Sequence, residues 1–344
     1  MKNTQQNQDN KQVPSSFGKK LGLTALLVVV LLLVRATFNV FMMMLAASLI
    51  ALYFHGLADL IERKTKLGQR WSMTISIAGS FLLLLALMFL VGSKVQSQVE
   101  QLSSNFPSMV EEAKGRLNES AVGRKVLEQF SGDNAKKVAG PARQFFSSTF
   151  GVLGDLYVIL FLGIFFTASP GIYKKGIIAL VPADSETAAE DILDKLGNKL
   201  KNWLKGKIFA MAVVAVLTAI SLAIVGVPMI FALALIAGVL NFIPNFGPIM
   251  AMVPAVLIGL SQGTDTALLI VGLYILIQVI ESNFITPLVQ NKLVSIPPAM
   301  IIAGQLIVGS LTGYLGIILA TPLVLIVMVL VQELYIKKKR SMNN

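Results

Sequence analysis

The residues that could do chemistry gather first in a short stretch of the carboxy-terminal half, residues 241–248, whose sequence is NFIPNFGP. Two prolines, a glycine and two asparagines within this stretch cannot continue a regular helix. Irregular backbone at membrane depth is tolerated only where it is buried in protein or lines a water-filled cavity, and in transporters it binds ions and polar substrates. We therefore predict a site for a small polar solute or a monovalent cation that includes Asn241, Pro244, Asn245 and Gly247. The alternative is a proline kink in a purely structural helix.

A second polar group closes the following apolar segment, 266–280. Gln278 precedes Glu281 and Ser282 by three and four residues, so the three side chains share one helical face. A charge at the centre of a bilayer costs roughly 2.5–3.5 kcal/mol, so that Glu281 needs a partner, a proton or a water-filled cavity. The alternative places Glu281 at the membrane interface, where water solvates it. We predict that Glu281 is the titratable coupling group, with Gln278 and Asn283 as polar neighbours.

Asp155 raises the same question inside the apolar segment 146–168. Lys207 or Arg35 could neutralise its charge. We include Asp155 among the candidate binding residues.

The composition places these residues in a membrane. The chain of 344 residues is 55% hydrophobic and 14% charged, whereas soluble domains carry about 25% charged residues. Residues 208–264 and 293–332 contain no Asp, Glu, Lys, Arg or His. Because about 20 apolar residues in a helix cross a bilayer, we predict an all-α polytopic membrane protein with about eight membrane segments, some of them broken or re-entrant.

The charge balance and the missing motifs exclude other classes. The net charge of +11 could indicate nucleic-acid binding, but many cations flank apolar spans, as the positive-inside rule requires, and we expect no nucleic-acid partner. The chain has no cysteine and one histidine, His55, and it contains neither a Ser/His/Asp arrangement nor an HExxH motif. It also lacks a GxxxxGK[ST] phosphate loop. We expect a protein that is not an enzyme, binds no cofactor or metal and draws its energy from a gradient.

The order of polar and apolar segments predicts seven sections. Residues 21–34 and 36–54 are interpreted as a helical hairpin that turns near Arg35, and Trp71 opens a third span. Apolar residues recurring at three- and four-residue steps from Val95 to Val110 predict an amphipathic helix. The sections are a disordered cytoplasmic tail (1–20), three membrane helices (21–92), an external amphipathic helical insert (93–145), a fourth membrane helix (146–168), a cytoplasmic amphipathic helical section (169–206), a carboxy-terminal bundle with broken helices (207–336) and a basic cytoplasmic tail (337–344).

The cytoplasmic section contains a basic amphipathic helix. Thr187 and Glu190 fit a capping box at its start. Its apolar stripe consists of Ile192, Leu196, Leu200 and Trp203, with lysines around it. This pattern predicts a helix on the inner membrane surface, and the alternative is docking against the protein's own bundle.

A second interrupted segment follows Pro297 and Pro298. Residues 299–308 have half the length of a span, and the spacing of Gly309 and Gly313 favours a close helix approach. Residues 315–335, interrupted by Pro322, are long enough to cross the membrane. Two interrupted segments in related positions point to a transport site. If both are hairpins, they could enter from opposite faces of the membrane.

The sequences NFIPNFGP at 241–248 and ESNFITP at 281–287, together with the glycines at 309–316 and Pro322, resemble the autoinducer-2 exporter family of bacterial inner-membrane proteins. Asn291 departs from the glycine that this family often has near that position. The resemblance implies eight membrane segments, both termini in the cytoplasm and a homo-oligomer, with a pentamer as the suggested number of subunits. Some members are linked to export of the furanone signal of quorum sensing, and others to exchange of sodium or lithium for protons.

Three functions are compatible with these observations. The leading hypothesis is a secondary transporter that exports a small polar solute similar to autoinducer-2, driven by an ion gradient, or a sodium (lithium)/proton antiporter. The second is an oligomeric channel, in which flux would not saturate with concentration. The third is a membrane scaffold whose external insert or basic helix binds another protein.

Overall fold

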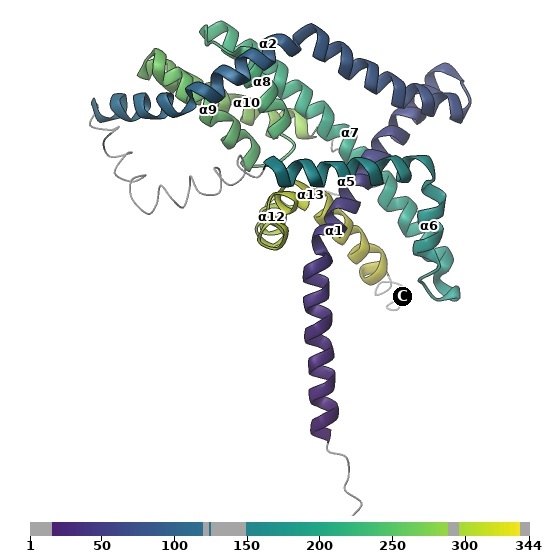
Figure 1. Ribbon diagram of the computed structural model, residues 1–344. Helices are drawn as coiled ribbons and strands as arrows, with labels where there is room; N and C mark the ends of the chain where they lie inside the picture. Colours follow the sequence, from purple (N-terminus) through teal and green to yellow (C-terminus); the bar gives the residue numbers. More distant parts are fainter. Residues whose placement is uncertain (1–15, 120–123, 125–148, 288–295, 338–344) are drawn as a thin grey trace, which may run out of the picture.

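The computed structural model describes residues 16–119, 124, 149–287 and 296–337 (Figure 1). Over these residues the chain is helical and contains no β-strand. Within the same residues four helices are long and apolar enough to cross a membrane, or five if one bent pair counts as a single span. Shorter apolar helices occupy residues 230–240, 246–262 and 298–312. The predicted all-α polytopic membrane fold with broken helices is therefore confirmed.

The first helix, α1 (Ser16–Thr65), is continuous. The predicted hairpin at Arg35 is therefore wrong, and Arg35 lies exposed in the middle of the helix. The physical reason is that no proline or glycine occurs between Gly22 and Gly56, and arginine is itself a good helix former. The amino-terminal half of α1 projects away from the other helices as a single rod (Figure 1).

The second helix, α2 (Gln69–Glu119), combines the predicted third span and the start of the predicted insert in one element. Its distal half packs on α8 (Ile230–Leu240) and α9 (Phe246–Gln262). There Leu102 is buried, as its place in the apolar stripe predicts, and the Gln98 side-chain oxygen accepts a hydrogen bond of 3.0 Å from the Ala232 amide. That amide is one of the N–H groups that the first turn of a helix leaves unpaired. The rest of the predicted insert, from residue 120 to 145, lies outside the described residues apart from residue 124.

The middle of the chain consists of two helices that meet at a sharp bend, followed by one long helix. The predicted fourth span corresponds to α5 (Thr149–Ala168). The next helix, α6 (Pro170–Ile178), is bent by 89° from the axis of residues 154–168. After a 3-10 turn, η1 (Ala183–Ser185), α7 (Glu186–Val225) joins the predicted basic helix to the first apolar segment of the predicted carboxy-terminal bundle. It ends at Gly226, whose φ of +77° is the left-handed conformation typical of helix ends. Because α7 begins at Glu186, Thr187 lies inside the helix and the predicted capping box is wrong.

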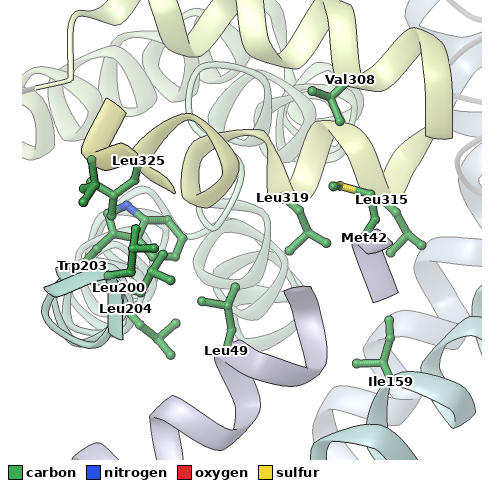
Figure 2. Close-up of a cluster of buried hydrophobic side chains, with 12 residues drawn as sticks. Met42, Leu49, Ile159, Leu200, Trp203, Leu204, Val308, Leu315, Leu319 and Leu325 are labelled. Atoms are coloured by element: carbon green, nitrogen blue, oxygen red, sulfur yellow. The ribbon is translucent and has the colours of Figure 1, made fainter. Parts of the chain in front are cut away.

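The apolar stripe of α7 packs inside the protein. Leu196, Leu200 and Trp203 are buried in one cluster with side chains of α1 and α13 (Tyr314–Leu330). Figure 2 shows Leu200, Trp203 and Leu204 gathered opposite Leu325. The predicted location of this stripe on the membrane surface is wrong, and the alternative, docking against the bundle, is confirmed. A long apolar stripe is stabilised by either surface, so the pattern alone does not choose between them.

The first broken segment is a hairpin. Helices α8 and α9 are joined by the short turn 241–245, and the Gln262 side chain donates a hydrogen bond of 3.4 Å to the Gly226 carbonyl oxygen. This bond brings the end of α9 back to the end of α7, where α8 also starts. The segment therefore enters and leaves at the same end of α7 instead of forming one kinked span. It is followed by α10 (Thr264–Ile280) and a π-helical turn, η2 (Glu281–Ile285).

The second broken segment is a hairpin as well, formed by α12 (Pro298–Thr312) and α13, which continues into η3 (Val331–Ile336). Gly309 allows the close approach that its spacing predicts, because a Cβ atom there would lie 2.7 Å from Ile317 Cγ1. Gly313 instead forms the turn, with a φ of +65°, so the predicted contact role of Gly313 is wrong. Lys195 of α7 lies 3.2 Å from Glu333 at the open end. The two hairpins therefore open towards opposite ends of α7.

Candidate functional site

The tip of the first hairpin, residues 241–245, is held by a compact set of backbone hydrogen bonds. The Ile243 amide donates to the Leu240 carbonyl at 2.9 Å, and the Phe246 and Gly247 amides donate to the carbonyls of Pro244 and Ile243 at 2.8 and 3.0 Å. Gly247 is indispensable to this turn, since a Cβ atom there would lie 1.9 Å from the Leu240 carbonyl oxygen. The predicted helix break is thus a turn that brings two helices together.

A glutamine from the second hairpin makes a hydrogen bond to this tip. Gln305 of α12 donates a hydrogen bond of 2.9 Å from Nε2 to the Pro244 carbonyl oxygen, which therefore accepts two hydrogen bonds. Gln305 is 1% exposed, and so is Asn241. The predicted site includes Pro244, but the Pro244 carbonyl oxygen is not free, because the side chain of Gln305, far away in the sequence, donates to it.

The unpaired polar atoms near the tip belong to side chains. Asn241 Nδ2, Gln305 Oε1 and Thr321 Oγ1 are buried and make no hydrogen bond within the described structure. Gly304, which precedes Gln305, faces Ala320, which precedes Thr321: a Cβ atom on Gly304 would lie 3.9 Å from Ala320 Cβ. Gln305 and Thr321 therefore lie at the same height in the two helices of the second hairpin. A buried polar group without a partner costs about 1–3 kcal/mol of stability, so these three atoms each carry an unmet hydrogen-bonding capacity. Sequence reasoning missed Gln305 and Thr321, although an amide in the charge-free stretch 293–332 is a detectable signal.

A buried ion pair joins α7 to η2. Lys207 Nζ is 3.6 Å from Glu281 Oε1, and their side chains are 12% and 8% exposed. The separation is longer than a direct hydrogen bond. Gln278 Nε2 donates to Glu281 Oε2 at 3.3 Å and to Ser282 Oγ at 3.2 Å, as their predicted shared face requires. Glu281 opens η2, and π-helical turns occur frequently at functional sites.

The hairpin tip and the ion pair are linked through one turn of α7. The Trp203 ring packs edge-on against the Phe242 ring of the tip, with their centroids 5.8 Å apart. Lys207 follows Trp203 by four residues and therefore lies on the same face of α7. The same turn of α7 therefore contacts the tip through Trp203 and carries Lys207.

The remaining candidate residues lie elsewhere. Asn245 is exposed and has a φ of +66°, and Asn283 is exposed and donates to the Val279 carbonyl at 2.9 Å. Asp155 of α5 accepts a hydrogen bond from the Tyr314 hydroxyl. Lys207 pairs with Glu281, so the prediction that it neutralises Asp155 is wrong. Within the described residues no cluster of three or more His, Cys, Asp or Glu could hold a metal ion.

Comparison with known proteins decides the family. The model of the AI-2E family transporters matches residues 21–336. The chain belongs to this family. A putative transport protein of Bacillus subtilis, YueF, is 24% identical over 84% of this chain and 82% of its own length. Another, YrrI, is 29% identical over 48% of this chain and 46% of its own length, so the chain spans about half of that relative. The AI-2 transport protein TqsA of Escherichia coli is 28% identical over 33% of each chain.

Membership of the AI-2E transporter family agrees with the predicted resemblance. It supports membrane transport as the general function and a multi-pass membrane protein as its form. The two interrupted hairpins and their contact through Gln305 and Pro244 lie within the matched region.

Proposed function

We propose that this AI-2E family protein is a secondary transporter that exports a small polar solute, bound at the tip of the first hairpin. Five buried side-chain atoms have no hydrogen-bond partner within the described residues, and two of them, Thr218 Oγ1 and Tyr274 Oη, belong to α7 and α10. The observation that carries the proposal is that the other three, Asn241 Nδ2, Gln305 Oε1 and Thr321 Oγ1, belong to the two hairpins that meet at this tip. Each unpaired atom lowers the stability of a dry core, so three of them where the hairpins meet support the binding of a polar solute that would pair with them.

The chemistry of these atoms indicates the kind of solute. The amide nitrogen of Asn241 donates hydrogen bonds, the amide oxygen of Gln305 accepts them and the hydroxyl of Thr321 does both. This set suits an uncharged molecule with hydroxyl and carbonyl groups. The family description and the name of the relative TqsA, an AI-2 transport protein, support autoinducer-2 as this molecule. Because the sequence contains no phosphate-binding loop, we propose that an ion gradient drives export.

A second candidate is exchange of sodium or lithium for protons. The observation that favours it is the 3.6 Å separation of Lys207 and Glu281, which leaves the carboxylate buried without a direct hydrogen bond from the ammonium group. Such a carboxylate can exchange its lysine partner for a proton or a small cation. In both candidates we place the protein in the bacterial inner membrane, with the basic carboxy-terminal end of α1 and the basic carboxy-terminus of the chain in the cytoplasm, where the basic flanks of the spans belong.

Flux into proteoliposomes tests the two candidates together. Purified protein is reconstituted, and pH and sodium gradients are imposed separately while uptake of autoinducer-2, Na⁺ or Li⁺ is measured. We expect saturable, gradient-dependent flux of autoinducer-2 that Gln305→Leu lowers at least tenfold. Gradient-dependent flux of cations alone, lost in Glu281→Gln, would favour the second candidate. Flux that rises linearly with concentration and needs no gradient would contradict both and indicate a channel.

A further inference from the structure

Helices α1 and α7 cross at Gly56, close to the polar section of α7. Gly56 is buried, and a Cβ atom there would lie 3.0 Å from Lys201 Cγ and 3.1 Å from Lys205 Cε. The aliphatic stems of both lysines therefore lie against the backbone of α1. Long basic side chains often pack in this way and leave their charged ends at the surface.

The charges at this crossing do not balance. Lys201 Nζ lies 2.6 Å from Asp59 Oδ2. Lys205 is within electrostatic range of this pair and of Arg63. Lys205 thus has one carboxylate and two other cations near it, and that carboxylate is paired with Lys201. Within the described residues neither Lys205 nor Arg63 has a carboxylate oxygen within the 4.0 Å of an ion pair. An anion placed between Lys205 and Arg63 would relieve their mutual repulsion.

The crossing lies where the membrane surface is expected. Lys205 and Lys207 are the last charged residues before the charge-free stretch 208–264. Phe209 follows Lys205 by four residues, shares its helical face and is 53% exposed. A cation and an exposed apolar ring one turn apart match the two parts of a lipid, the headgroup and the acyl chain.

We propose that the crossing of α1 and α7 binds the phosphate of an anionic phospholipid, with Lys205 and Arg63 as its ligands. Basic pockets between membrane helices on the cytoplasmic side bind such headgroups, and the guanidinium group of arginine matches phosphate with two parallel hydrogen bonds. The acyl chain lies along Phe209. The buried stripe of α7 packs into the bundle, so the lipid contact of this helix is confined to its basic face.

The test measures lipid retention by the full chain. Protein purified in detergent is titrated with dioleoylphosphatidylglycerol or dioleoylphosphatidylcholine, and bound lipid is counted by native mass spectrometry. We expect selective retention of phosphatidylglycerol. The variant Arg63→Gln/Lys205→Gln should bind it about thirtyfold more weakly, since each basic residue near a membrane contributes about 1 kcal/mol. The matched variant Lys64→Gln/Arg70→Gln removes the same charge from two exposed residues nearby and should bind as the wild type does.

Three results would overturn the proposal. These are equal retention of the two lipids, undiminished phosphatidylglycerol binding by the Arg63→Gln/Lys205→Gln variant, and displacement of the lipid by inorganic phosphate at equal concentration, which would assign the site to a soluble anion. Thermal unfolding without added lipid checks that the variants are folded. If the double variant does not fold, the single variant Lys205→Gln replaces it in the test, and its affinity for phosphatidylglycerol should fall about fivefold because one charge is removed.

Discussion

Gln305 donates a hydrogen bond of 2.9 Å to the carbonyl oxygen of Pro244 and thereby joins the two hairpins that open towards opposite ends of α7. The donor is almost completely buried, and its own amide oxygen has no partner within the described structure. One side chain therefore both closes the helix break and presents an unpaired acceptor beside it. This double role makes Gln305 the residue from which the proposed site is best tested.

Replacement of Gln305 by leucine should separate stability from transport. Leucine has a similar volume and removes the unpaired oxygen together with the donor, so the free energy of unfolding should change by less than about 1.5 kcal/mol. Solute flux into proteoliposomes should fall at least tenfold. Gln332→Leu, at a half-buried position near the end of the chain, is the control and should leave flux unchanged. A Gln305→Leu protein with full flux would refute the role of this side chain.

Gly247→Ala should disrupt the hairpin tip. The added methyl group would lie 1.9 Å from the Leu240 carbonyl oxygen, which belongs to backbone and cannot move without breaking the turn. We expect destabilisation of at least about 2 kcal/mol, seen as a lower midpoint of thermal unfolding in detergent.

Gly272→Ala is the matched control for this clash. Gly272 lies within α10, and no heavy atom of a neighbouring element lies within 4 Å of the place that the added methyl group would take. Alanine there should leave stability unchanged or raise it by up to about 1 kcal/mol, because it favours the helix more than glycine does. Equal midpoints for the Gly247 and Gly272 variants would show that the tip is not packed as described.

The Lys207–Glu281 pair should behave as a coupled buried pair. Glu281→Gln leaves the lysine buried without a counter-charge and should cost about 3–5 kcal/mol, whereas the double variant Glu281→Gln/Lys207→Met should recover most of that loss. The measurement is a double-mutant cycle of thermal unfolding. Lys201→Met, which breaks the more exposed pair with Asp59, should cost no more than about 1 kcal/mol.

The same variants also test the coupling role. If Glu281 couples transport to protons, the folded double variant should lose the pH dependence of flux. Additive losses of stability together with an unchanged pH profile would count against any special role of the pair.

The sequence predicted the elements better than the contacts between them. The break at 241–248 was predictable because prolines and glycines act locally, and the shared face of Gln278 and Glu281 follows from helical spacing alone. The contact between Gln305 and Pro244 could not be predicted, because 61 residues separate the two and no local pattern pairs them. The turn predicted at Arg35 is wrong for a related reason. A charged residue between two apolar segments is typical of a loop, but arginine does not interrupt the backbone hydrogen bonds of a helix as proline does.

The partner of Glu281 illustrates the same limit. The cost of burying a carboxylate predicts that a partner exists, but only the packing of η2 against α7 selects Lys207 over the other cations. Asp155 was expected to need a cation and instead receives a hydroxyl hydrogen bond from Tyr314. Electrostatics therefore predicts that a buried carboxylate has a partner, and the tertiary structure decides which residue that partner is.

Protection of a single introduced cysteine by solute is the sharpest test of the binding site proposed at the hairpin tip. The natural chain contains no cysteine, so Thr321→Cys introduces one thiol beside the hairpin tip, and Ala320→Cys introduces a buried neighbouring control. The account predicts that the thiol at 321 reacts with a small methanethiosulfonate reagent, that autoinducer-2 slows this reaction in a saturable manner, and that the thiol at 320 stays inert. A thiol at 321 that is unreactive, or that reacts at the same rate with and without solute, would contradict the proposed binding site.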